Sequence, residues 1–221
     1  MTCSKLPIVC LVVLAAAAPF ATQLKTPADW KWRTDSPSEV TQSLDPAASQ
    51  MTFVAMPPGW HITTGPGALL YHPGYQVSGN FAVEAEIFLF PGDSQEEYGI
   101  FLAGKNLGPA ERPSYLGFVA RRDGMGAIRR GSGEPIVDWK ANDAIAPHPG
   151  KDTVKNVLRV DASPTEIVFT ANGKEVARIA REGTSLDGYV GFRIGRSMNV
   201  HASRLDITHR LAPVPVKKTK P

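Results

Sequence analysis

The feature that most constrains the fold is the run of short alternating segments over residues 156–207. Apolar and polar side chains alternate within each segment, and turn residues separate one segment from the next. Asn172-Gly173 joins two of the segments, and this dipeptide accepts the positive φ angles of a type I′ turn. The block therefore predicts antiparallel strands that include a hairpin centred on this dipeptide.

Earlier segments extend the same pattern. The longest predicted strand covers residues 81–90, and the apolar side chains at its odd positions predict one core-facing side. Residues 98–103 are apolar throughout, which indicates a strand buried on both faces. Residues 60–63 and 68–71 are predicted to pair as a hairpin around Gly65-Pro66-Gly67. Because no convincing helix follows residue 22, we expect an all-β fold, a two-sheet antiparallel β-sandwich.

The first 22 residues predict export. A short basic start ending at Lys5 precedes an apolar run over residues 6–20. A membrane span needs about 20 apolar residues, so this run is typical of a cleavable secretory signal peptide. We expect a periplasmic or extracellular protein whose mature chain has no membrane span. Cys3 and Cys10 both lie in this segment, so the mature chain would have no disulfide and no thiolate metal site.

The remaining chain divides into three predicted parts. Residues 23–50 are rich in Pro, Ser, Thr and Asp and are expected to form an N-terminal extended arm. Trp30 and Trp32 share a face of this arm if it is extended, either as an edge strand against the sandwich or as a platform for stacking sugars. Residues 51–210 form the predicted sandwich domain, and residues 211–221 a disordered tail rich in Pro and Lys.

The charge balance argues against a nucleic-acid partner. The chain has 24 Lys and Arg against 21 Asp and Glu, a formal net charge of +3. Outside the C-terminal tail the basic residues are scattered along the chain, so no concentrated basic face for a phosphate backbone is expected.

The order of strands and glycines resembles that of a known family over about residues 52–209. The segments that carry the resemblance include Gly59-Trp60-His61, Gly79-Asn80-Phe81 and Gly188-Tyr189-Val190-Gly191. They resemble concanavalin A-like and laminin-G-like jelly rolls, and are similar to the 3-keto-disaccharide hydrolase domain. The resemblance implies a jelly roll whose curved face meets carbohydrate. Residues 96–100 and 115–122 depart from that domain's catalytic pattern, so no catalytic residue carries over.

Two glutamates are the catalytic candidates. Glu84 and Glu86 lie two apart on one predicted strand, so they share a face about 7 Å apart, a spacing compatible with glycoside hydrolysis. The same arrangement occurs on any strand with a solvated face. Arg121 or Arg193 is expected to face these glutamates in cross-strand ion pairs, or else to form a polar site for sugar hydroxyls.

Ligand binding is predicted for aromatic and arginine side chains, because flat rings stack on the C–H faces of sugars and polar groups bind hydroxyls. The candidates are Trp60, Tyr98, Tyr115, Arg121, Trp139 and Arg193. No histidine metal motif is present, and we expect no metal site and no cofactor. Calcium at the Asp123-Gly124 or Asp187-Gly188 turn is the alternative.

Three functions remain open from the sequence. The favoured one is a non-catalytic carbohydrate-binding module. A glycoside-processing hydrolase of the 3-keto-disaccharide type is the first alternative, so enzymatic activity is undecided. The second is a structural or assembly protein that acts through its sheet edge or N-terminal arm. The oligomeric state does not follow from the sequence.

Overall fold

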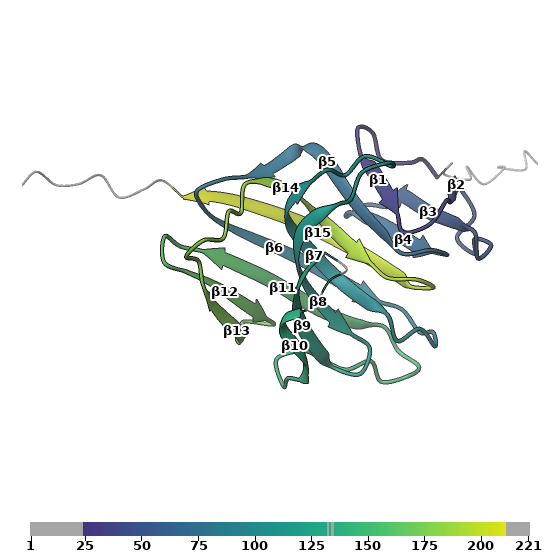
Figure 1. Cartoon of the computed structure of the whole chain (residues 1–221). Helices are drawn as coiled ribbons and strands as arrows, with labels where there is room; N and C mark the ends of the chain where they lie inside the picture. Colours follow the sequence, from purple (N-terminus) through teal and green to yellow (C-terminus); the bar gives the residue numbers. More distant parts are fainter. Residues whose placement is uncertain (1–23, 132, 134, 211–221) are drawn as a thin grey trace, which may run out of the picture.

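The computed structural model describes residues 24–210 except 132 and 134, and these residues form two stacked β-sheets (Figure 1). In this described part of the chain, no helix is long and apolar enough to cross a membrane. The predicted signal peptide and C-terminal tail lie outside it. The prediction of an all-β, two-sheet sandwich is confirmed.

One sheet has seven strands in the order β1-β5-β14-β7-β8-β9-β10, and all its pairs are antiparallel. Its strands are β1 (Lys31–Thr34), β5 (Ala68–Val77), β7 (Glu97–Lys105), β8 (Ser114–Arg121), β9 (Met125–Arg130), β10 (Pro135–Ala141) and β14 (Gly188–Ile194).

The other sheet has eight strands in the order β13-β12-β11-β6-β15-β4-β3-β2, antiparallel except for the pair of β2 and β3. Its strands are β2 (Glu39–Thr41), β3 (Gln50–Ala55), β4 (Trp60–Thr64), β6 (Asn80–Leu89), β11 (Val154–Ala162), β12 (Glu166–Ala171), β13 (Lys174–Ala180) and β15 (Asn199–Arg210).

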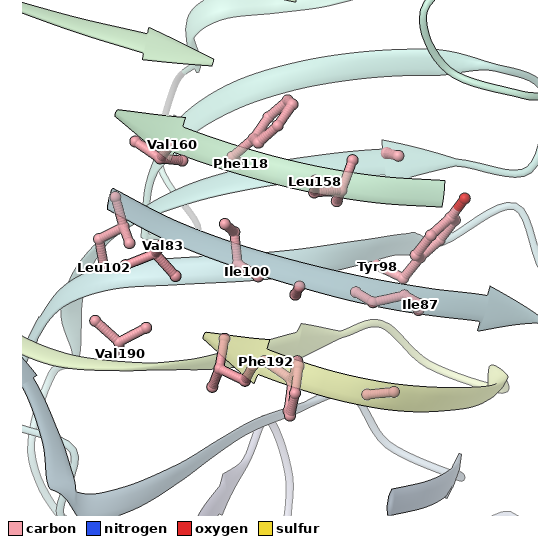
Figure 2. Packing of buried hydrophobic residues seen from close by; sticks show 14 of the residues in the cluster. Val83, Ile87, Tyr98, Ile100, Leu102, Phe118, Leu158, Val160, Val190 and Phe192 are labelled. Atoms are coloured by element: carbon pink, nitrogen blue, oxygen red, sulfur yellow. The ribbon is translucent and has the colours of Figure 1, made fainter. Parts of the chain in front are cut away.

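The core lies between the sheets and follows the predicted alternation. The odd positions of β6 are completely buried: Phe81, Val83, Ala85, Ile87 and Leu89. Figure 2 shows side chains of β6 meeting those of β7, β8 and β14 from the other sheet. This packing of apolar faces from both sheets supplies the main hydrophobic stabilisation of the fold.

Strand β7 is buried on both faces, as its apolar sequence predicts. Its inner side chains, including Ile100, belong to the core. On its outer side Phe101 packs in a second apolar cluster with Tyr71 and Tyr115. Leu107, from the loop that follows β7, belongs to the same cluster and is itself buried. The loop therefore shields part of the outer face of the seven-stranded sheet from water.

The predicted Asn172-Gly173 hairpin is present between β12 and β13. Both residues have positive φ angles, 49° at Asn172 and 80° at Gly173, as a type I′ turn requires.

The predicted pairing of residues 60–63 with 68–71 is wrong. Strand β4 pairs with β3 and β15, whereas β5 pairs with β1 and β14 in the other sheet. The intervening turn is held against the chain, because Gly65 N donates to Gln50 O (2.8 Å) and Thr64 Oγ1 donates to Gly195 O (2.6 Å). The segment thus carries the chain from one sheet to the other.

The N-terminal arm is built into the sandwich. Strand β1 pairs with β5 and forms one edge of the seven-stranded sheet, which agrees with the edge-strand interpretation. Trp30 is buried and lies parallel to Phe192, with ring centroids 5.7 Å apart and an interplanar angle of 3°. Trp32 is 37% exposed at the edge. The arm therefore contributes an aromatic anchor to the core.

Candidate functional site

Four of the six predicted ligand residues lie on the outer face of the seven-stranded sheet. On β8, the alternation that points Phe118 into the core points Tyr115 and Arg121 out of the sandwich. Arg193 of β14 reaches the same outer face, where it donates to Glu97. Glu97 pairs in register with Arg121, and Arg121 contacts the fourth residue, Trp139 of β10. The sheet thereby groups four candidates around Glu97.

A network of ion pairs occupies the centre of this outer face; we call Asp35, Glu97, Arg129 and Arg193 the outer-face charge cluster. Arg193 Nε lies 2.9 Å from Glu97 Oε1, and Arg129 Nη1 lies 2.8 Å from Glu97 Oε2. Arg193 also binds Asp35 at two points, Nη1–Oδ1 at 2.8 Å and Nη2–Oδ2 at 2.9 Å. Paired forks of this kind fix the orientation of both partners.

Burial shapes the electrostatics of the cluster. Desolvation opposes charge on Arg193, but the hydrogen bonds to Asp35 and the nearby negative charges outweigh it and raise its pKa. Burial raises the pKa of the Tyr115 phenol, while the positive charge of Arg193 acts in the opposite sense. At neutral pH a neutral and largely buried phenol therefore lies beside fixed charges.

Arg121 and Trp139 flank the cluster. The guanidinium carbon of Arg121 lies 5.2 Å from the centre of the Trp139 ring, within the range of a cation–π contact. Arg121 Nη2 also donates to Asp123 Oδ2 at 2.8 Å. The pair presents an aromatic ring together with a hydrogen-bond donor, two groups that saccharides can use.

A separate hollow of about 390 Å³ lies where the N-terminal arm meets the loop after β7. Trp30, Trp32 and Tyr71 line one side of it, and Leu107 and Pro109 line the other. If the two tryptophans stack on a sugar, as one sequence interpretation has it, the sugar would lie in this hollow. Trp30 itself is buried.

Two predicted ligand residues lie away from the outer face. Tyr98 is completely buried between the sheets, and its hydroxyl accepts a hydrogen bond from Asn156 Nδ2 at 2.9 Å (Figure 2). The prediction that Tyr98 contacts a ligand is wrong, because its alternation on β7 points it into the core. Trp60 is half-buried and packs against Trp30, with ring centroids 4.8 Å apart. It therefore belongs to the anchor of the arm.

Glu84 and Glu86 lie on β6, in the eight-stranded sheet. Glu84 forms ion pairs with Arg159 and Arg204, from the neighbouring strands β11 and β15. Glu86 lies 3.3 Å from Lys155 Nζ and accepts a 2.7 Å hydrogen bond from Ser203, which lowers its pKa.

The predicted pairing of these glutamates with Arg121 or Arg193 is wrong. Arg121 and Arg193 belong to β8 and β14 of the seven-stranded sheet, whereas β6 belongs to the other sheet. Alternation predicts which faces the side chains occupy but does not assign strands to sheets.

Among the described residues, no group of three or more His, Cys, Asp or Glu side chains is arranged to hold a metal ion. Asp123 acts as a turn residue, because its Oδ1 accepts from Met125 N at 3.1 Å while Oδ2 binds Arg121. Calcium binding at Asp187 stays a prediction.

Three members of the charge cluster are not among the residues that the sequence predicts to bind a ligand. Glu97 is the first residue of the apolar strand β7, in a segment that departs from the family's catalytic pattern. Arg129 is one of several arginines on segments predicted to be neighbouring strands, and residue type alone does not distinguish it from the others. Asp35 lies 158 positions before Arg193, and no local pattern connects the two. Only the pairing of β1 with β5 and of β5 with β14 brings them together.

Two stacked, mainly antiparallel sheets with this strand order define a concanavalin A-like jelly-roll sandwich. No family model and no curated protein matches the sequence. The fold is similar to that of the carbohydrate-binding module CBM66 from Bacillus subtilis, with a TM-score of 0.57, 11% identity and coverage of 82% of this chain and 96% of that one. It is also similar to a protein of unknown function with a galectin-like fold from Bacillus subtilis, with a TM-score of 0.59, 12% identity and coverage of 81% and 89%.

Proposed function

We propose that the protein is an exported, non-catalytic carbohydrate-binding module whose ligand lies on the outer face of the seven-stranded sheet. The observation that carries this proposal is the pairing of Arg121 with the Trp139 ring beside the buried residues Tyr115, Arg193 and Glu97. Sugars are bound by aromatic ring faces together with a few fixed polar groups, and this face offers both.

The similarity to CBM66 supports the proposal at the level of the fold. The neighbour is named as a carbohydrate-binding module and shares the sandwich over most of both chains. One fold serves many functions, so the residues of the outer face carry the proposal.

The state of the carboxylates favours binding over hydrolysis. Both oxygens of Glu97 and both oxygens of Asp35 accept hydrogen bonds from arginines. Glu84 and Glu86 are likewise engaged by basic side chains on the other sheet. A glycosidase needs two carboxyl groups that flank the scissile bond and act on it, and these four carboxylates already have partners within the fold.

The assembly alternative finds no support in the N-terminal arm. Trp30 anchors the arm in the protein's own core, and Asp35 binds the protein's own Arg193. These two residues of the arm are therefore occupied within the protein itself. The assembly alternative therefore depends on a sheet edge, and it becomes an outcome of the test below.

A glycan array followed by titration of the bound glycans tests the proposal. Trp139→Ala is expected to weaken binding at least tenfold, whereas Trp32→Ala, at the exposed edge of the arm, is the matched control and should leave it unchanged. Loss of binding in Trp32→Ala alone would move the site to the hollow beside the arm. Binding of no glycan, with a mass in solution that rises with concentration, would support assembly instead.

Fractionation of the producing cells tests export.

A further inference from the structure

A cavity of about 300 Å³ opens at one end of the seven-stranded sheet. It lies beside the end of β7, the start of β8 and the end of β9, and residues 184–185 before β14 close another side. Small-molecule sites have volumes of about 300–1,000 Å³, so the cavity has room for a single sugar residue rather than a long chain.

The charge of this cavity is one-sided. Lys105, Arg112 and Arg130 line it, and among the residues that the structure describes no carboxylate does so. None of these three side chains forms an ion pair with another described residue. The nearby Glu111 is turned to its own loop, where Oε2 accepts from Gly108 N at 3.0 Å. Three cations gathered at one concave site create a positive potential that attracts anions.

Hydroxyl groups accompany the cations. Ser114, Thr184 and Ser185 contribute to the lining and can bind the hydroxyls of a sugar. An inorganic anion alone would not need this mixture. The combination of cations and hydroxyls matches a ligand that has both a negative group and several hydroxyls.

Tyr115 connects the cavity to the outer face. Tyr115 lines the cavity. Its ring lies near Gly131 on the cavity side and near Gly117 on the outer face. A Cβ atom added to Gly131 would lie 4.0 Å from the ring, and one added to Gly117 would lie 3.6 Å from it. Tyr115 therefore borders the cavity and the outer face at once.

We infer that the cavity binds the negatively charged terminal residue of an acidic saccharide, through Arg112 and Arg130 with Lys105. This inference rests on the proposed function and names its ligand class. Guanidinium groups bind carboxylate and sulfate oxygens in a two-point geometry and lose less hydration than an ammonium group, so they suit an anionic sugar.

Calorimetric titration of the purified protein at low salt with three probes tests the inference. The probes are trigalacturonate, its fully methyl-esterified form and a sulfated galactose oligosaccharide of the same length. At least one charged probe should bind ten times more tightly than the ester. Arg112→Gln combined with Arg130→Gln should abolish that advantage. Arg178→Gln, an exposed arginine on β13, is the matched control and should change nothing.

Each outcome decides a different point. Preference for trigalacturonate indicates a carboxylate, and preference for the sulfated probe indicates a sulfate ester. Equal affinity for acid and ester, or an unchanged double variant, overturns the inference, while the proposed function stands if Trp139→Ala still removes neutral glycan binding. Displacement by equimolar inorganic sulfate also overturns it, because the cavity would then select the charge alone. Binding of no saccharide would reject both proposals.

Discussion

Arg193 of β14 holds Asp35 of the N-terminal arm in a two-point ion pair, although 158 positions separate them in the chain. The same guanidinium binds Glu97 of β7, so one side chain connects the arm to the central strands. Arg193 is 8% exposed as a residue, and Glu97 is 9% exposed. The contact thus links the stability of the fold to the shape of the proposed binding face.

Replacing Arg193 is expected to destabilise the protein strongly. Arg193→Leu should lower the free energy of unfolding by about 3 kcal/mol, because the buried Glu97 then keeps only Arg129. Asp35→Asn should cost about 1 kcal/mol, since the side chain of Asp35 is half exposed. Urea unfolding measures both values. Arg196→Leu, whose side chain is 72% exposed, is the control, and an equal loss in that variant would contradict the prediction.

The two residues of the Asn172-Gly173 turn are expected to differ in importance. Gly173→Ala should cost about 1 kcal/mol, because an alanine is strained at the φ of +80° found there. No further cost is expected from a clash, since no other atom lies within 4 Å of the added Cβ. Asn172→Gly keeps the turn but removes hydrogen bonds to Ala144 O, Asn156 Oδ1 and Val157 N, so it should cost about 2–3 kcal/mol. Chemical denaturation ranks the two variants, and the reverse order would show that turn geometry dominates.

Tyr98 is expected to make stability fall at alkaline pH. Burial raises its pKa from 10.0 to about 12 in the folded protein. Below pH 10 the phenol is neutral in both states, so its full contribution is present. Between pH 10 and 12 the unfolded chain binds fewer protons, and the free energy of unfolding falls by up to about 3 kcal/mol.

Unfolding free energies measured from pH 9 to 12 in the parent protein and in Tyr98→Phe test this. The phenols of Tyr71 and Tyr115, whose pKa values burial also raises, are present in both proteins. The difference between the two proteins therefore isolates Tyr98. Parallel pH profiles would mean that its phenol ionises equally easily in the folded and unfolded chain.

Substitution of the two glutamates on β6 should leave binding intact. Glu84→Gln and Glu86→Gln are expected to cost below about 1 kcal/mol each, because ion pairs that remain partly exposed to solvent contribute little. They should not change glycan affinity, since they lie on the other sheet from the proposed site. Assays of the variants with 3-keto-glycosides complete the test. A hydrolytic activity that disappears in either variant would support the hydrolase alternative.

Local sequence patterns predicted the strands and their faces well. Alternation along β6 identified its buried side, and the continuous apolar run of β7 predicted burial on both faces. These features follow from the two-residue period of a strand, which operates over a few residues. The positive φ angles at Asn172 and Gly173 follow equally from local backbone preference.

The candidate site was only partly predictable for the same reason. Residue type alone predicts Tyr115, Arg121, Trp139 and Arg193 as ligand residues, and the sheet brings them together on one face. Residue type predicts Tyr98 equally, and Tyr98 lies in the core. Residue type indicates what a side chain can bind, but the register of its strand decides whether a ligand can reach it.

The sequence by itself determined an all-β sandwich, its principal hairpin and the inward faces of its longest strands, because these depend on neighbours a few residues apart. The tertiary structure alone decided that β4 and β5 belong to different sheets, and that Asp35, Glu97 and Arg193 meet. Strand pairing is a choice among distant segments with similar alternation, and burial of both apolar faces at once selects it. The proposed binding face is a product of that selection.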